Sequence, residues 1–398
     1  MDAKEIDEYV EAHREEAVEF LQKMLRTPSP TGQEYAVSQV IKESLEKDQL
    51  PVELHALDPQ RPNVYVEWVG NPQGTTFLFN GHEDVFPPSE KAKDPWSGRI
   101  EGDTIYGCGS ADMQTGLSAG IMTLKFLKRS GFQPNGILKL SCDCDEEQGG
   151  KYGVLYLMSE GLLDADFGVC MEASEDLVIT DSDGRIGWEV IYRSEPWHAG
   201  MRSTWQNPIA KAQRAIARLY EYDDYLKKNR YFNSRDGGAI LTITEISAGN
   251  QGKTSNVNPT ECHFSIDRRY TKGETIESAT MELKKILDEL KHEDPAMDYE
   301  LKTLVASPRL IMDENSPCIA AAMDAYKQYI GPDVRLGRRC GGGDTAKITQ
   351  KYGFPLPQFG PGRFDQLCVP DEHVSIQEYL NFIKIYMYMV FKLVGEKY

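Results

Sequence analysis

The sequence predicts an α/β protein in which a three-layer domain carries a smaller inserted α+β domain. Three observations support this. Strand-like and helix-like patterns alternate over residues 1–182. The pattern changes over residues 183–293, where two long helices accompany at least three strands. Alternation then resumes over residues 294–398, so the simplest account is an insertion within one discontinuous domain.

The first part begins with apolar side chains at helical spacing, which predict a helix over residues 5–25 that the segment TPSPTG (27–32) ends. A second helix follows. β-rich runs then predict three strands, VELHAL (52–57), NVYVEWV (63–69) and TTFLFNG (75–81). The rest of this part predicts a helix over 112–129, a strand over 136–145, a helix over 151–163 and a strand over 167–173.

The inserted part, residues 183–293, is predicted to contain longer helices and strands than the first part. Its expected helices are 207–228 and 274–291, and its expected strands begin at 188, 239 and 261. The last part predicts helices over 314–330, 343–353 and 375–393 with short strands between them.

Composition narrows the function classes. Apolar residues make up 40% of the 398 and charged residues 27%, as in globular proteins. The net charge of −18 disfavours nucleic acid and anionic membrane as partners. No apolar run approaches a membrane span, and the acidic N-terminal segment does not resemble a signal peptide, so we expect a cytoplasmic protein with its eight cysteines reduced.

Acidic residues and histidine recur where predicted strands end. The clusters are His82-Glu83-Asp84, Asp112, Asp145-Glu146-Glu147 and Glu172. Ligands bind at strand ends in open α/β sheets, and one histidine with several carboxylates suits a pair of divalent cations that share a carboxylate. Each cluster taken alone is more often structural; their joint order predicts a two-metal site.

Nine ordered motifs carry a family resemblance over nearly the whole chain. They include FNGHEDVFPP (79–88), DPWSGRIEGDTIYGCGSADMQTG (94–116), CDEEQGGKYG (144–153), VCMEAS (169–174), WHAG (197–200) and GGGDTA (341–346). The chain resembles the co-catalytic di-zinc amidohydrolases and metallopeptidases that include acetylornithine deacetylase, succinyl-diaminopimelate desuccinylase, aminoacylase and glutamate carboxypeptidase. The resemblance implies a zinc-peptidase-like catalytic domain and an inserted lid and dimerisation domain.

The resemblance also implies metal ligands. His82 and Glu172 would bind the first cation, Glu147 the second, and Asp112 would bridge both. The cations are expected to be Zn²⁺, with Co²⁺ or Mn²⁺ as alternatives.

Two further residues of this region match catalytic positions. Glu146 matches the general base, which takes a proton from the metal-activated water and passes it to the leaving amine. Asp84 would orient the His82 imidazole.

Position 368 departs from the family pattern. Cys368 precedes Val-Pro-Asp-Glu where the family has a histidine. We favour a Cys368 thiolate as a ligand of the second cation, which would favour Zn²⁺. The alternatives are that His373 reaches in instead, or that the second metal site is weak or absent.

The inserted domain carries the remaining candidates. His198 matches a histidine that stabilises the oxyanion in the partner's active site of a homodimer. Asn256 and Arg269 match positions that hold the substrate carboxylate, although strand alternation leaves open whether Arg268 or Arg269 faces the pocket. Gly343, in a glycine-rich run, is expected to let the backbone approach the substrate or to form a tight turn.

We therefore predict a metal-dependent hydrolase that cuts the amide bond of a small anionic N-acyl amino acid or short peptide. A dipeptidase or carboxypeptidase, or an N-carbamoyl amino acid hydrolase, would use the same chemistry. A non-catalytic binding protein on the same scaffold is the alternative from another class, since loss of a ligand histidine is what such a protein would show.

Overall fold

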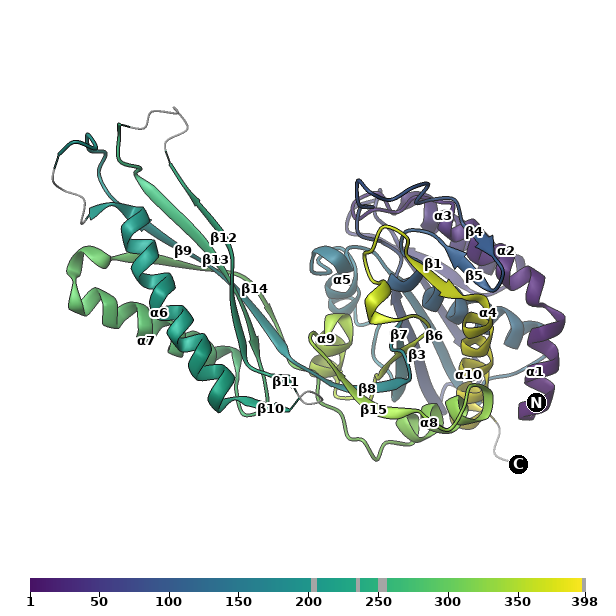
Figure 1. Cartoon of the computed structure of the whole chain (residues 1–398). Coiled ribbons are helices and arrows are strands. Elements are labelled where there is room, and N and C mark those ends of the chain that lie inside the picture. Colours follow the sequence, from purple (N-terminus) through teal and green to yellow (C-terminus); the bar gives the residue numbers. More distant parts are fainter. Residues whose placement is uncertain (202–205, 234–236, 250–255, 396–398) are drawn as a thin grey trace. The chain divides into compact units, whose positions relative to one another are not determined.

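The computed structural model describes residues 1–201, 206–233, 237–249 and 256–395. The chain forms two compact units (Figure 1). The first comprises residues 1–180, 311–337 and 343–398, and the second comprises residues 181–310 and 338–342. The mixed α/β fold predicted from the sequence is confirmed.

The first unit is built on an eight-stranded sheet of order β1-β2-β6-β3-β7-β16-β8-β15. Strands β6, β3, β7 and β16 run parallel to one another, whereas β1 and β2, β2 and β6, and β16 and β8 pair antiparallel. A small sheet of order β17-β5-β4 lies in the same unit. The strands are β1 Val52–His55, β2 Asn63–Val69, β3 Thr75–His82, β4 Arg99–Glu101, β5 Thr104–Tyr106, β6 Gly136–Asp143, β7 Phe167–Ala173, β8 Leu177–Ser182, β15 Arg335–Arg339, β16 Gln358–Gly360 and β17 His373–Ser375.

Helices cover both faces of the large sheet (Figure 1). Helices α1, α2, α3, α4, α8 and α10 contribute to the larger apolar core on one face, and α5 and α9 contribute to a smaller core on the other. Their bounds are α1 Ala3–Ala12, α2 Arg14–Leu25, α3 Tyr35–Lys47, α4 Thr115–Arg129, α5 Val154–Ser159, α8 Pro317–Tyr329, α9 Gly343–Tyr352 and α10 Ile376–Val394.

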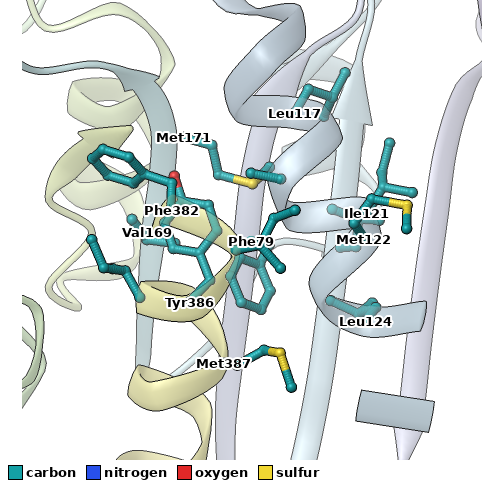
Figure 2. Packing of buried hydrophobic residues seen from close by; sticks show 14 of the residues in the cluster. Phe79, Leu117, Ile121, Met122, Leu124, Val169, Met171, Phe382, Tyr386 and Met387 are labelled. Carbon is teal, nitrogen blue, oxygen red and sulfur yellow. The ribbon is translucent and has the colours of Figure 1, made fainter. Parts of the chain in front are cut away.

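Alternation along the central strands separates these two cores. Phe77 and Phe79 of β3 point into the larger core, whereas Leu78 between them belongs to the smaller one. Figure 2 shows Phe79 beside Val169 and Met171 of β7, with Leu117 of α4 and residues of α10 around them. A strand with both faces buried reads as a continuous apolar run, as TTFLFNG does.

The N-terminal helix differs from its prediction. The expected single helix over residues 5–25 is two helices, α1 and α2, that meet at His13. The His13 ring stacks on Tyr9 at 4.3 Å, and its Nδ1 lies 2.8 Å from the Tyr9 carbonyl oxygen. This local contact accompanies a non-helical backbone at His13 that apolar spacing does not reveal.

The second unit is a four-stranded antiparallel sheet of order β12-β13-β9-β14 whose apolar face packs on two helices. Its main elements are β9 Gly184–Arg193, α6 Pro208–Asn229, β12 Ile240–Ala248, β13 Glu261–Tyr270, α7 Ile276–Glu293 and β14 Tyr299–Ser307, with the short pair β10 Tyr231–Asn233 and β11 Gly237–Gly238. Buried and less buried residues alternate along β13. In the described part of the chain, no helix combines the length and apolarity that crossing a membrane requires.

Candidate metal centre

The candidate ligands lie where three adjacent strands end. Strands β6, β3 and β7 are parallel neighbours, so their carboxyl ends share one edge of the sheet. His82 is the last residue of β3, Glu172 lies one residue before the end of β7, and Glu146 and Glu147 form a turn after β6. Asp112 comes from the irregular segment Ser110–Gln114 that leads into α4.

These side chains converge. His82 Nε2 lies 3.3 Å from Asp112 Oδ1 and 3.4 Å from Glu172 Oε1. Among the described residues, one potential ligand atom each of His82, Asp112 and Glu147 lies within 4.8 Å of the other two. Four distant stretches of chain thus meet at one point, as the strand-end argument predicts.

The polar atoms at this point fit a divalent cation. His82 is 2% exposed, and its Nε2 has no hydrogen-bond partner in the described structure despite its close approach to two carboxylates. Glu147 Oε1 is another buried polar atom without a described hydrogen-bond partner. Buried polar atoms without partners are rare in native proteins, and an imidazole with carboxylates is a donor set that zinc and related cations accept.

Local hydrogen bonds hold the ligands in place. His82 Nδ1 lies 2.8 Å from the main-chain oxygen of Asp84, which leaves Nε2 directed at the centre. The Asp84 carboxylate lies 3.6 Å from the same ring and also accepts hydrogen bonds from the backbone N–H groups of Glu146 and Glu147, at 3.0 and 3.4 Å. Thr31 donates a further bond to it at 2.8 Å. Asp84 therefore links the histidine strand to the turn that carries both glutamates.

The electrostatics of this cluster favour a bound cation. Burial and the neighbouring Asp344 carboxylate raise the pKa of Glu146 to about 8. Burial raises the pKa of Glu147 to about 9, with nearby Asp112 adding to it. Burial acts to lower the pKa of His82, but the surrounding carboxylates raise it well above its ordinary value. A divalent cation would stabilise the charged form of these buried carboxylates and offset their mutual repulsion.

Cys368 lies beside this cluster. It lines a pocket with Asp112 and Glu147, in an exposed turn where its φ is +57°. Among described residues, however, Cys368 is not part of the group whose ligand atoms lie within 4.8 Å of one another. His373 lies on β17, where its ring packs on Tyr106 at 5.1 Å, and it does not line this pocket.

Gly343 begins helix α9 with φ +48°. A Cβ at this position would lie 3.0 Å from Glu146 Oε1, so the missing side chain leaves room for the general-base candidate. In the next turn, Lys347 donates a hydrogen bond to Asp344 at 2.8 Å and another to the Gly149 carbonyl at 3.1 Å.

The second unit brings two of its candidates together. His198 pairs with Val257 in an isolated antiparallel bridge, and the Ala199 N–H donates to the Asn256 carbonyl at 2.8 Å. Both His198 and Asn256 are exposed.

The two neighbouring arginines of β13 lie on opposite faces of its sheet. Arg268 is 1% exposed on the apolar face and binds Glu274. Arg269 lies on the other face, where it binds Asp267 at 2.7 Å and the Cys340 carbonyl. Arg269 is therefore the more accessible of the two.

A sequence profile of peptidase family M20/M25/M40 matches residues 78–392, which include every candidate metal ligand. The chain belongs to this family. Its members are hydrolytic enzymes, so the prediction of a hydrolase on a metallopeptidase scaffold is confirmed at that level.

Individual family members agree with this assignment. The chain is 25% identical to a succinyl-diaminopimelate desuccinylase from Wolbachia pipientis subsp. Culex pipiens over 396 residues, covering 95% of each protein. It is 27% identical to carboxypeptidase G2 from Pseudomonas sp. over 300 residues, covering 72% of this chain and 68% of the relative. The fold matches a dinuclear metal-binding peptidase of the same family from Bacillus subtilis with a TM-score of 0.70 and 15% identity, covering 96% and 98% of the two chains.

The structure adds a residue that sequence reasoning left without a role. Glu372 is buried, and its carboxylate accepts hydrogen bonds from the N–H groups of Gly109, Ala111 and Asp112 at 2.8, 2.7 and 3.0 Å. It therefore fixes the loop that carries Asp112. Its place in the Cys-Val-Pro-Asp-Glu stretch was the available sequence signal.

Proposed function

We propose that this chain is a two-metal amidohydrolase that cuts the amide bond of a small N-acyl amino acid or short peptide bearing a free carboxylate. The observation that carries the proposal is the convergence of Asp112, Glu147 and Glu172 on His82 Nε2, which has no hydrogen-bond partner among the described residues, with Glu146 beside them. A desuccinylase and a carboxypeptidase among the relatives support this substrate class.

The proposed roles follow from position. His82 and Glu172 would hold one cation, Glu147 the other, and Asp112 both. Such a pair supplies a water of lowered pKa and polarises the amide carbonyl. Glu146 would accept the proton of that water and return it to the leaving nitrogen.

We propose Cys368 as a further ligand of the second cation. It lines the pocket with Asp112 and Glu147, and a thiolate would favour Zn²⁺ over Mn²⁺ or Co²⁺. Metal analysis of Cys368→His tests this role. A shift in metal preference supports direct ligation, and unchanged content and preference would refute it.

We propose that the second unit binds the substrate carboxylate through Asn256 and Arg269 and acts as a lid. Arg269 suits this because a guanidinium can bind both carboxylate oxygens. We further propose that His198 stabilises the oxyanion in the partner subunit of a homodimer formed through this unit. The edge strand β12 supports such pairing, because it exposes Ile240 and Ile246. A monomer by sedimentation at micromolar concentration would refute the dimer. The cytoplasm is the proposed location, in keeping with eight unpaired cysteines.

The test is release of free amine from a panel of N-succinyl, N-acetyl and N-carbamoyl amino acids and dipeptides, with Zn²⁺, Co²⁺ or Mn²⁺ added. The panel separates deacylase, dipeptidase or carboxypeptidase, and carbamoylase activity. Glu146→Gln should abolish turnover while leaving metal binding in place. Turnover equal to wild type in this variant would refute the assigned base, and absence of turnover on every substrate would favour the binding-protein alternative.

A further inference from the structure

A buried ion-pair cluster lies directly behind the proposed catalytic turn. Arg61, in the segment between β1 and β2, donates hydrogen bonds to Glu34 at 2.6 and 3.1 Å and to Asp145 at 2.8 Å. Glu34 is fully buried and Asp145 is 3% exposed. The Arg61 guanidinium also lies over the Tyr152 ring, 4.6 Å from its centroid. An arginine that bridges two buried carboxylates in this way has a fixed orientation.

Asp145 immediately precedes Glu146 and Glu147, and its backbone is unusual. Its φ is +69°, a left-handed conformation that non-glycine residues seldom adopt. Three contacts of Asp145 oppose relaxation of this turn. Its carbonyl accepts from the Gly150 N–H at 2.7 Å, and its carboxylate accepts from Arg61 and, at 3.2 Å, from the Tyr152 N–H. These contacts therefore stabilise a left-handed backbone conformation that an aspartate rarely adopts without them.

The turn is held from its other side as well. The Asp84 carboxylate accepts the N–H groups of Glu146 and Glu147 at 3.0 and 3.4 Å. Arg61 and Asp84 thus hold three consecutive residues. Arg61 binds the Asp145 side chain, and Asp84 binds the N–H groups of Glu146 and Glu147. Within the described part of the chain, the Arg61 side chain contacts Glu34, Asp145 and Tyr152, none of which is a candidate metal ligand, so it would act on the centre through Asp145.

We infer that Arg61 is a positioning residue: held by Glu34 and Asp145, it fixes the turn that directs the Glu146 and Glu147 carboxylates at the metal centre. The inference rests on the proposed function, because Glu147 must be a metal ligand and Glu146 the base for the turn to matter. Residues that orient ligands from behind typically change metal affinity or activity about 10–100-fold when replaced.

Arg61→Lys is the direct test, because lysine keeps the charge but lacks the planar guanidinium fork that bonds both carboxylates at once. We expect kcat to fall about 10–100-fold with KM changed less than about 3-fold, and Zn²⁺ affinity by calorimetry to fall about 10–100-fold. Glu34→Gln, which keeps the shape of the cluster and one acceptor, should lie between wild type and Arg61→Lys. It also provides a second variant if Arg61→Lys folds poorly.

Arg129→Lys is the matched control. Arg129 likewise bridges two carboxylates, those of Glu16 and Asp48, but at the end of α4. We expect this variant to lose thermal stability while keeping wild-type kcat and Zn²⁺ affinity. If Arg61→Lys behaves like this control, the positioning role is refuted.

The wild-type results separate the two proposals. Zn²⁺ binding without turnover would refute the proposed hydrolysis. The comparison of Zn²⁺ affinity between wild type and Arg61→Lys would still decide the role of Arg61. A wild-type chain that binds no divalent cation would overturn both.

Discussion

Glu372 offers the sharpest test of how the Asp112 loop is built. The carboxylate Oε1 accepts from Ala111 and Asp112, and Oε2 accepts from Gly109. Gly109 itself has φ +78°, and a Cβ there would lie 2.2 Å from Val85 Cγ1, so the loop has little freedom to find other partners. Replacing Glu372 therefore removes the acceptor without offering the N–H groups a substitute.

The magnitude follows from the number of donors. A buried donor left without a partner costs about 1–3 kcal/mol. Glu372→Ala leaves three N–H groups without an acceptor. Because water can enter the vacated space and bind some of them, we expect a loss of about 3–5 kcal/mol in the free energy of unfolding. Glu372→Gln keeps one oxygen for Ala111 and Asp112 but turns its amide group toward the Gly109 N–H. That change should cost about 1.5–3 kcal/mol.

Urea unfolding with matched kinetics measures both effects. Asp103→Asn is the control, because Asp103 also accepts backbone and hydroxyl bonds, from Gln377 and Ser375, but is exposed and away from the ligands. It should cost less than about 1 kcal/mol and leave kcat unchanged. For Glu372→Gln we expect kcat about 10–100-fold lower, since Asp112 loses its support. A Glu372→Ala protein with the stability and kcat of the control would refute this account of the loop.

Three further predictions rest on single observations. Chelation should lower the melting temperature, and added Zn²⁺ should restore it. The reason is that free Zn²⁺ at 100 times its dissociation constant adds about 2.7 kcal/mol of stability. An unchanged melting temperature by calorimetry would contradict a metal site in the folded protein. Gly116→Ala should cost more than about 2 kcal/mol by urea unfolding, because its Cβ would lie 1.8 Å from Met171 O, whereas wild-type stability would mean that α4 moves freely from β7. Burial raises the pKa of Glu378 above its ordinary value of 4.5, so its contribution to stability is full below pH 4.5 and is lost as pH rises through the folded pKa. Glu378→Gln should flatten this fall above pH 4.5, and parallel stability–pH curves for the two proteins would contradict the prediction.

The sequence predicted the strand-end part of the centre for a physical reason. His82, the Glu146–Glu147 turn and Glu172 follow β3, β6 and β7, and parallel strands bring their carboxyl ends to one edge. Apolar runs located these strands within a few residues. Their convergence then required only that the three be neighbours in the sheet.

Other parts depend on contacts that no periodic pattern encodes. Arg61 meets Glu34 and Asp145 from separate loops, and Glu372 reaches back across 260 residues to Asp112. The break at His13 is accompanied by a ring contact with Tyr9, which apolar spacing does not encode. Side-chain hydrogen bonds between distant loops leave no signature of spacing, so they became visible only in three dimensions.

The two apolar cores and the metal centre are stabilised by different means. The cores depend on buried area along β3, β7, α4 and α10, whereas each ligand-bearing loop is held by a carboxylate. Asp84 and Asp145 hold the Glu146–Glu147 turn, and Glu372 holds the Asp112 loop. Removing one such carboxylate changes the geometry of a ligand-bearing loop, so variants at these positions should lose kcat as well as stability. Core truncations such as Leu117→Ala should lose stability alone, costing about 2–5 kcal/mol with little change in the kcat of the folded fraction.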